Sequence, residues 1–251
     1  MYVACSTLCF VKHTLDEALT AARTLRFAKV DLAVRPHGGN LTPAEVVADV
    51  GRTVQRVKLG AVPVAAVHLI PSSEAAAKGE LKAVCRLARL LASPVLCVPA
   101  APADTPVPAE VARLTEWVRL AAGEGVILTV ETAAGTLTGT PDGAAELCRQ
   151  VSGLGLTLDP SHYTAGTTET VSYDHLFPFV RHVRLRDTGR GKNEFQLRVG
   201  QGDIDYGRIV TQLDRFNYTR ALTVDVRDVA DSPFPVEPEV RKLKYLLESL
   251  V

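Results

Sequence analysis

The chain has 251 residues, 47% of them hydrophobic, and its 28 basic side chains balance 28 acidic ones. A neutral protein without a basic block lacks the electrostatic surface that nucleic acid requires, so we expect no nucleic-acid partner. No apolar run approaches the ~20 residues of a membrane helix, and the first residues lack the basic start of a secretory signal. We therefore expect a cytoplasmic protein with no membrane partner.

The five cysteines are odd in number and scattered, and none forms a Cys-x-x-Cys pair. They are Cys5, Cys9, Cys85, Cys97 and Cys148. This usage is typical of free thiols in a reducing compartment.

Short apolar runs alternate with longer amphipathic segments along the whole chain. The runs that predict strands are residues 2–6, 29–34, 62–70, 94–100, 126–131, 154–159, 181–187 and 220–226. Helices are predicted over 14–27, 42–58, 73–92, 107–125, 140–151, 205–216 and 237–251, with a short irregular connector around 173–180. Thr14 with Glu17 predicts a capped helix start, as does Thr42 followed by Pro43.

Eight strands, each followed by a helix or by the short connector, with no intervening linker predict a single (β/α)₈ TIM barrel that spans residues 1–251. The rival is a doubly wound open sheet, which would carry a glycine-rich phosphate turn directly between a strand and a helix. The stretch GQGDIDYG at 200–207 does not link a strand to a helix, and it has acids where a pyrophosphate would bind. We therefore favour the closed barrel.

One four-residue sequence motif recurs at the ends of three predicted strands: LTVE at 128–131, LTLD at 156–159 and LTVD at 222–225. Side chains alternate between the two faces of a strand, so each threonine and acid share one face and the aliphatics share the other. An outward acid would be buried beneath helices without a partner, which is costly. Glu131, Asp159 and Asp225 should therefore point into the barrel.

The same alternation in residues 181–187 turns His182, Arg184 and Arg186 inward. Four adjacent strands then direct charged groups into the mouth formed by their C-terminal ends, which is where TIM barrels carry their sites. We interpret this constellation as a functional site.

These motifs resemble the xylose isomerase-like barrel family, which includes sugar-phosphate isomerases, ketose 3-epimerases and related abasic-site endonucleases. The resemblance covers essentially the whole chain. It rests on TVETAAG at 129–135, LDPSHY at 158–163, RLRD at 184–187, GQGDIDYG at 200–207 and YTRALTVD at 218–225.

The resemblance implies a sugar or sugar-derivative isomerase or epimerase that moves a proton next to a carbonyl. Glu131, Asp159 and Asp225 would then hold a divalent metal (Mn, Mg, Co or Zn). Glu131 and Asp225 would transfer protons, and His162 would contact a substrate oxygen. The partner would be a small polyhydroxy or anionic molecule, and a homo-oligomer is compatible with the sequence.

Two residues depart from the family pattern. Arg184 stands where the family has a histidine ligand, and Asp225 stands where it has a glutamate. Arginine offers only hydrogen-bond donors, and a guanidinium ~4 Å from a dication would repel it by roughly 8 kcal/mol at an effective dielectric near 20. The alternative is a metal-free binding or regulatory protein in which Arg184 replaces the metal, surrounded by Glu131, Asp159 and Asp225. Arg184 and Arg186 could equally bind a phosphate or carboxylate of the substrate.

Three weaker candidates complete the predicted site. His68, at the end of the third strand, and His37, on the loop after the second, are candidate substrate contacts, whereas the direction of Asp31 is left open. A DNA-repair endonuclease is disfavoured, because it needs a histidine-rich metal cluster and a basic face.

Overall fold

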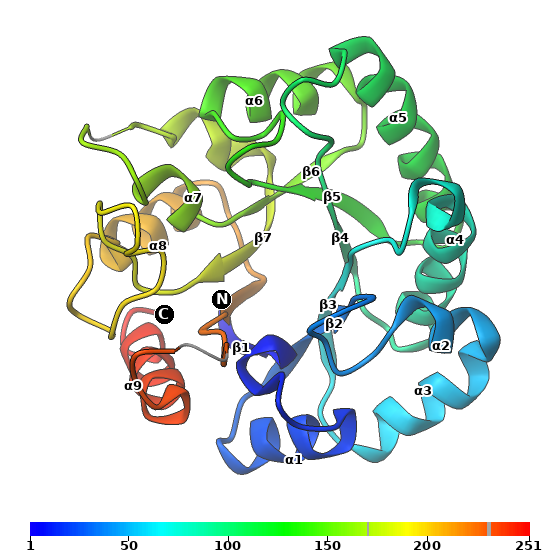
Figure 1. Cartoon of the computed structure of the whole chain (residues 1–251), viewed down its shortest axis with the longest axis horizontal. Coiled ribbons are helices and arrows are strands. Elements are labelled where there is room, and N and C mark those ends of the chain that lie inside the picture. The colour runs from blue at the N-terminus through cyan, green and yellow to red at the C-terminus, as the bar shows by residue number, and fades with distance from the viewer. Residues whose placement is uncertain (170, 230–231) are drawn as a thin grey trace.

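The computed structural model describes residues 1–169, 171–229 and 232–251. Eight parallel strands pair in chain order, and β8 pairs with β1 to close the barrel. The helices surround this ring on the outside (Figure 1). The predicted TIM barrel is therefore confirmed. In the described part of the chain, no helix has the length and apolar content needed to cross a bilayer.

The eight predicted strands are all present, and their ends differ from the predicted ones by at most two residues. They are β1 Tyr2–Ser6, β2 Lys29–Val34, β3 Val64–Leu69, β4 Val95–Pro99, β5 Ile127–Glu131, β6 Gly155–Leu158, β7 Val180–Leu185 and β8 Ala221–Val224.

The helices follow the strands around the barrel. They are α1 Leu15–Thr24, α2 Pro43–Ala48, α3 Val50–Leu59, α4 Glu74–Leu90, α5 Val107–Gly123, α6 Pro141–Gln150, α7 Ser161–Thr164, α8 Tyr206–Arg215 and α9 Val236–Glu248. Two 3₁₀ segments, η1 Thr7–Phe10 and η2 Asp174–Phe179, join them. The single helix predicted over 42–58 is wrong, because Asp49 adopts an extended backbone and its side chain caps a new helix at the Arg52 amide.

The predicted helix starts are confirmed. Thr14 and Glu17 form a capping box, in which the Thr14 amide donates to Glu17 Oε2 at 2.8 Å and the Glu17 amide donates to Thr14 Oγ1 at 3.4 Å. Thr42 caps α2 in the same way, with Pro43 in its first turn. These caps satisfy backbone donors that a helix leaves unpaired.

The two faces of the strands have the predicted character. Leu128, Val130 and the other outward aliphatics belong to one hydrophobic core that the strands share with the helices. Inside the barrel, Thr129 and Thr157 are fully buried and their hydroxyl oxygens lie 2.7 Å apart. The five cysteines are buried and free. Trp117, also buried, packs beneath the guanidinium of Arg113 on α5.

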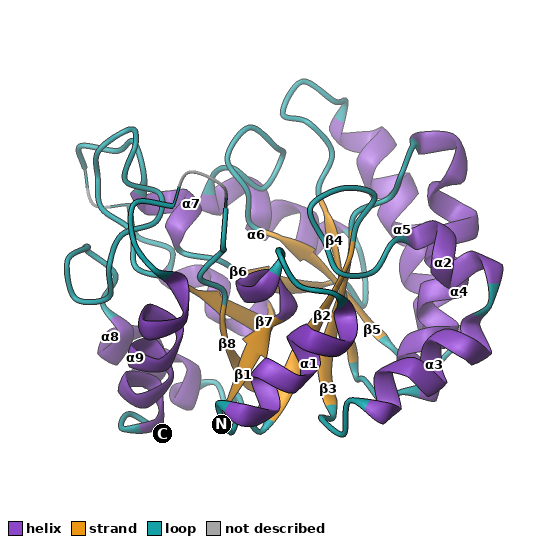
Figure 2. Cartoon of the chain, turned by 60° about the horizontal axis from the view of Figure 1, so that its bottom comes forward, coloured by secondary structure: helices purple, strands orange, loops and turns teal. Residues whose placement is uncertain are grey.

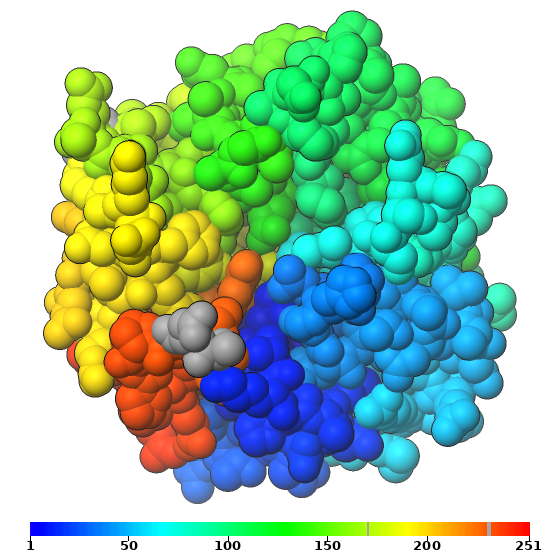
Figure 3. Space-filling view, viewed as in Figure 1, coloured from blue at the N-terminus to red at the C-terminus, as the bar shows by residue number. Residues whose placement is uncertain are grey.

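Because all strands run parallel, their C-terminal ends open on one face, from which long loops extend (Figure 2). Side chains from the beginning, the middle and the end of the sequence meet around the centre of the molecule (Figure 3). Residues far apart in the chain can therefore contact one another at this mouth.

Candidate functional site

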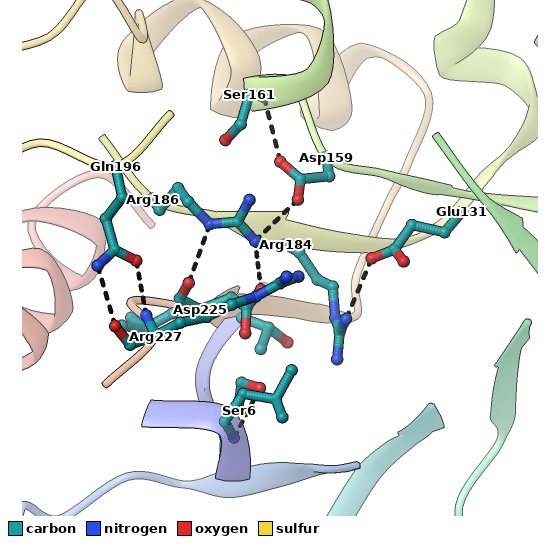
Figure 4. Close-up of polar contacts among 12 residues, drawn as sticks. Ser6, Glu131, Asp159, Ser161, Arg184, Arg186, Gln196, Asp225 and Arg227 are labelled. Carbon is teal, nitrogen blue, oxygen red and sulfur yellow. Dashed lines mark hydrogen bonds and ion pairs between the residues drawn. The ribbon is translucent and has the colours of Figure 1, made fainter. Parts of the chain in front are cut away.

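Two arginines occupy the mouth of the barrel: Arg184 on β7 and Arg186, the residue that follows this strand. Neither has any exposed surface. Arg184 donates from Nε to Asp31 Oδ2 at 2.9 Å and from Nη1 to Glu131 Oε1 at 3.1 Å. The same Nη1 lies 2.7 Å from Nδ1 of His68. Arg184 therefore connects residues of β2, β3 and β5 through the barrel interior. Its contact with Glu131 is drawn in Figure 4.

Arg186 forms a second ionic cluster beside the first. Its Nη2 lies 2.9 Å from Asp159 Oδ2 and also donates to Asp225 Oδ2, and its Nε donates to the Asp225 carbonyl at 3.0 Å. The planar guanidinium lies over the ring of Phe195, 4.7 Å from its centroid. The expectation that all three acids surround Arg184 is thus corrected: Asp159 and Asp225 bond to Arg186 (Figure 4).

The buried histidines can be assigned protons from their partners. Because a guanidinium only donates, Nδ1 of His68 must accept from Arg184. The proton of His68 then lies on Nε2, which faces Glu131 Oε2 at 3.3 Å. Burial and the charge of Arg184 lower the pKa of His68, so the ring is neutral at neutral pH. His182 points inward as predicted, with Nε2 2.9 Å from Asp31 Oδ2.

The carboxylates remain ionised in spite of their burial. Burial alone would raise the pKa of Asp31, but Arg184 and His182 outweigh it and lower the pKa to about 2. For Glu131, His68 and Arg184 overcome burial and hold the pKa well below its usual range. The pKa of Asp225 is likewise lowered, because the charges of Arg227, Arg184 and Arg186 outweigh burial. Asp31, Glu131 and Asp225 are therefore fixed negative charges.

The partly exposed side chains at the rim are those that a ligand would meet. Glu131 has a side-chain exposure of 10%, His162 of 17% and Arg227 of 25%, whereas Asp159 and Asp225 have none. Arg227 donates from Nε and Nη2 to Asp225 Oδ2, both at 3.2 Å. Access to the cluster therefore passes over Glu131, His162 and Arg227.

His162 lies on α7, a short helix that the sequence did not predict. Its Nδ1 accepts from the Ala134 amide at 3.2 Å, and its ring packs against that of Phe195 with centroids 4.7 Å apart and planes inclined by 55°. Nε2 therefore carries the proton and faces Asp159 Oδ2 at 3.7 Å. Burial lowers the pKa of His162 against the opposing influence of Asp159, which leaves a neutral donor at the rim.

The loop at 200–207 has a structural role. The amides of Gly200, Gln201 and Gly202 all donate to Oδ2 of Asp187, the residue after Arg186. A Cβ at Gly202 would lie 2.4 Å from Asp187 Oδ1, so only glycine fits there. The amides that could cradle a phosphate are already occupied by a carboxylate of the chain itself, in agreement with the expectation that this is no phosphate loop.

Most of the predicted site residues converge. Glu131, Asp159, Arg184, Arg186 and Asp225 form the two clusters, and His68 and His162 contact them. His37 is exposed on the loop after β2 and its role as a substrate contact stays a prediction.

Two arginines of the mouth were missed. Arg35 follows β2, and Arg227 follows β8. The two-residue spacing from Asp31 through Ala33 to Arg35, and from Asp225 to Arg227, is the signal that could have found them, since alternate residues of a strand share a face.

The residues present do not fit a divalent metal at the position that the resemblance implied. Asp31, Glu131, Asp159 and Asp225 already bind guanidinium groups, so a metal among them would lie close to fixed positive charge. Each of these carboxylates is already neutralised by a guanidinium, so little net negative charge remains to bind a second cation.

One group of potential ligands does come together. The group consists of His68, Cys97 and Glu131, which can each bring one ligand atom within 4.8 Å of the other two. Burial raises the pKa of the Cys97 thiol far above its usual value, whereas a metal needs the thiolate. Both ring nitrogens of His68 face existing partners. Magnesium in addition prefers oxygen ligands, so this trio is a poor metal site as it stands.

The sequence matches the model of one protein family, described as the xylose isomerase-like TIM barrel, over residues 63–248. The chain belongs to this family. No curated protein matches the sequence.

Solved structures give the same fold over the whole length of this family member. A D-tagatose 3-epimerase-like protein has a TM-score of 0.74 at 17% identity, with coverage of 100% of this chain and 98% of the other. A xylose isomerase-like TIM barrel protein from Mycobacterium smegmatis, solved in complex with magnesium, gives 0.76 at 17% identity with the same coverage. The apo 3-keto-D-glucoside 4-epimerase from E. coli gives 0.73 at 13% identity and covers 99% of both chains.

Proposed function

We propose that this protein is an isomerase- or epimerase-like member of the family that binds a sugar or sugar derivative at the C-terminal mouth of the barrel. In this proposal Arg184 supplies the positive charge that a divalent metal would otherwise supply. The observation that carries the proposal is the Arg184 guanidinium, held by Asp31, His68 and Glu131, with a buried Nη2 that has no hydrogen-bond partner among the residues that the structure describes. Two structural neighbours, a D-tagatose 3-epimerase-like protein and a 3-keto-D-glucoside 4-epimerase, support the substrate class.

The chemistry follows from the positions of the donors and acceptors. A proton next to a carbonyl becomes removable when the developing negative charge on the oxygen is stabilised. The unpaired N–H groups of Arg184 Nη2 would donate to that oxygen, and Nε2–H of His162 would donate to a neighbouring hydroxyl. Glu131, the carboxylate with the most exposure in the cluster, would accept the proton from carbon.

Asp225 is less suited to proton transfer than Glu131. Its carboxylate is completely buried and accepts from Arg186 and Arg227. We therefore give Asp225 the role of fixing the two arginines, with Glu131 as the proton acceptor.

A second candidate function is ligand binding without turnover. It is favoured by the low pKa of Glu131, since a carboxylate held ionised by His68 and Arg184 is a weak base. Both candidates use the same mouth of the barrel, and they differ in whether the proton next to the carbonyl exchanges.

The test is solvent deuterium exchange, followed by NMR on a panel of ketoses, aldoses, sugar acids and sugar phosphates with a chelator present. Exchange at the carbon next to the carbonyl, lost in Glu131→Gln and retained in Glu110→Gln, would support the enzyme. Glu110 is a matched control because it is a buried glutamate paired with Arg113 outside the mouth. Saturable binding without exchange would favour the second candidate. The absence of both binding and exchange would refute both candidates.

A further inference from the structure

Arg35 is a partly buried arginine without an acidic partner. It is the residue that follows β2, and its side chain packs against Gly39 of the next loop. In the described part of the chain, its buried Nε has no hydrogen-bond partner, and no carboxylate lies within ion-pair distance of its guanidinium. A buried charge without a counter-charge is costly, so this arrangement calls for an explanation.

The electrostatic surroundings of Arg35 are those of the mouth. Arg227 and Arg184 lie close enough to repel it, and Asp225 and Glu131 close enough to attract it. Burial and the two arginines together lower the pKa of Arg35, so repulsion and desolvation outweigh attraction. The nearby carboxylates are already committed, Glu131 to Arg184 and Asp225 to Arg186 and Arg227.

Further donors without partners lie deeper in the same mouth. Within residues 1–169, 171–229 and 232–251, Arg184 Nη2 and Arg186 Nη1 have no hydrogen-bond partner, and both atoms are buried on side chains that have no exposed surface. Buried N–H groups in folded proteins almost always have an acceptor. A group that only accepts, such as a carboxylate or a phosphate, satisfies several of them at once, whereas each sugar hydroxyl also brings a donor.

We propose that Arg35 and Arg227 form a subsite for an oxyanion group of the substrate, next to Arg184. This inference rests on the proposed function and narrows its substrate class to sugars that carry a carboxylate or a phosphate. Arg35 and Arg227 lie at the accessible rim and receive the anion, and Arg184 bonds to the part of the ligand that reaches the buried cluster. Guanidinium groups suit this task because their planar N–H pairs match the oxygens of carboxylates and phosphates.

The experiment is isothermal titration calorimetry of the full chain with four probes: inorganic phosphate, D-gluconate, D-fructose 6-phosphate and D-fructose. Each probe is titrated into the wild type and into Arg35→Met. The control is Arg220→Met, which removes another partly buried arginine with an unpaired buried nitrogen. Arg220 precedes β8 and thus lies at the opposite end of the barrel. The two variants have the same net charge, so a general charge effect is excluded.

We expect at least one anionic probe to bind the wild type, and to bind Arg35→Met roughly tenfold or more weakly. The affinity should be unchanged in Arg220→Met, and the affinity of the wild type should decrease steeply at high salt. Preference for D-gluconate or for D-fructose 6-phosphate then decides between carboxylate and phosphate. Binding of inorganic phosphate that depends on Arg35, without binding of any sugar, would support the subsite and refute the proposed function. Equal binding of D-fructose and D-fructose 6-phosphate, unaffected by Arg35→Met, would overturn the subsite and leave the proposed function intact. Absence of binding by every anionic probe would also overturn it.

Discussion

Nε of Arg184 on β7 donates to Oδ2 of Asp31 on β2 across 2.9 Å, although β8 and β1 separate the two strands in the barrel wall. His182, one layer below on β7, bonds to the same oxygen. The interior of the barrel is therefore tied together by charged hydrogen bonds at the level where the family resemblance implied a metal. This network makes the mouth a preorganised set of charges that are buried and paired.

Removal of Arg184 should destabilise the fold, because Asp31 and Glu131 would stay buried without a partner. We predict that Arg184→Met lowers the free energy of unfolding by about 3–5 kcal/mol, measured by urea denaturation at pH 7. Arg149→Met, which breaks an exposed pair with Glu146, should change it by less than about 1 kcal/mol. A loss in Arg184→Met as small as that of the control would mean that the network is not a stabilising element.

The free energy of unfolding should decrease as the pH is lowered through two ranges. His68 has a lowered pKa when folded, so its contribution is complete above the unfolded value of about 6.5 and declines as the pH drops below it. Asp31, with a folded pKa of about 2, contributes above its unfolded value of about 3.9 and loses that contribution as the pH falls toward 2. The measurement is the urea midpoint from pH 8 to pH 2.5.

The upper window can be assigned with one variant. In His68→Gln, the amide can accept from Arg184 and donate to Glu131 without titrating, so the slope of stability between pH 7 and pH 5 should decrease. The control is His175→Gln, since His175 is a partly exposed residue paired with Asp142. An unchanged slope in His68→Gln would show that another group, with His162 the first candidate, controls this window.

The loop around Asp187 should tolerate no side chain at Gly202. A Cβ there would lie 2.4 Å from Asp187 Oδ1 and 2.6 Å from the Thr188 carbonyl. We predict that Gly202→Ala lowers the thermal midpoint and increases amide hydrogen exchange over residues 200–202. Gly79→Ala is the matched control, because Gly79 lies on α4 with no atom within 4 Å of the added Cβ, and it should stabilise by up to about 1 kcal/mol. Similar behaviour of the two variants would refute the assigned role.

The sequence predicted the barrel and the direction of its charged side chains because both depend on local alternation. The outward direction of the apolar side chains follows from the two-residue period of a strand. The inward direction of Glu131, Asp159 and Asp225 follows from the same period and from the cost of burying a charge beneath a helix. The closed order of strands follows from the number of units. These features need no knowledge of long-range contacts.

The pairing of charges could not be predicted, because it depends on reach across the barrel. Alternation placed Arg184 and Arg186 on the same face, but it did not show that Arg184 extends to Asp31 and Glu131 while Arg186 bonds to Asp159 and Asp225. The break at Asp49 was missed for a local reason, since an aspartate inside a helical pattern can also cap a new helix.

The central claim is that Arg184 takes the place of a metal ion. The most direct measurement is equilibrium dialysis of the purified protein and of Arg184→His against manganese, with elemental analysis of the bound ion. We expect no stoichiometric manganese in the wild type and a gain of binding in Arg184→His, where an imidazole would free Asp31 and Glu131 from the guanidinium. Near-stoichiometric manganese in the wild type, lost in Glu131→Gln, would contradict it.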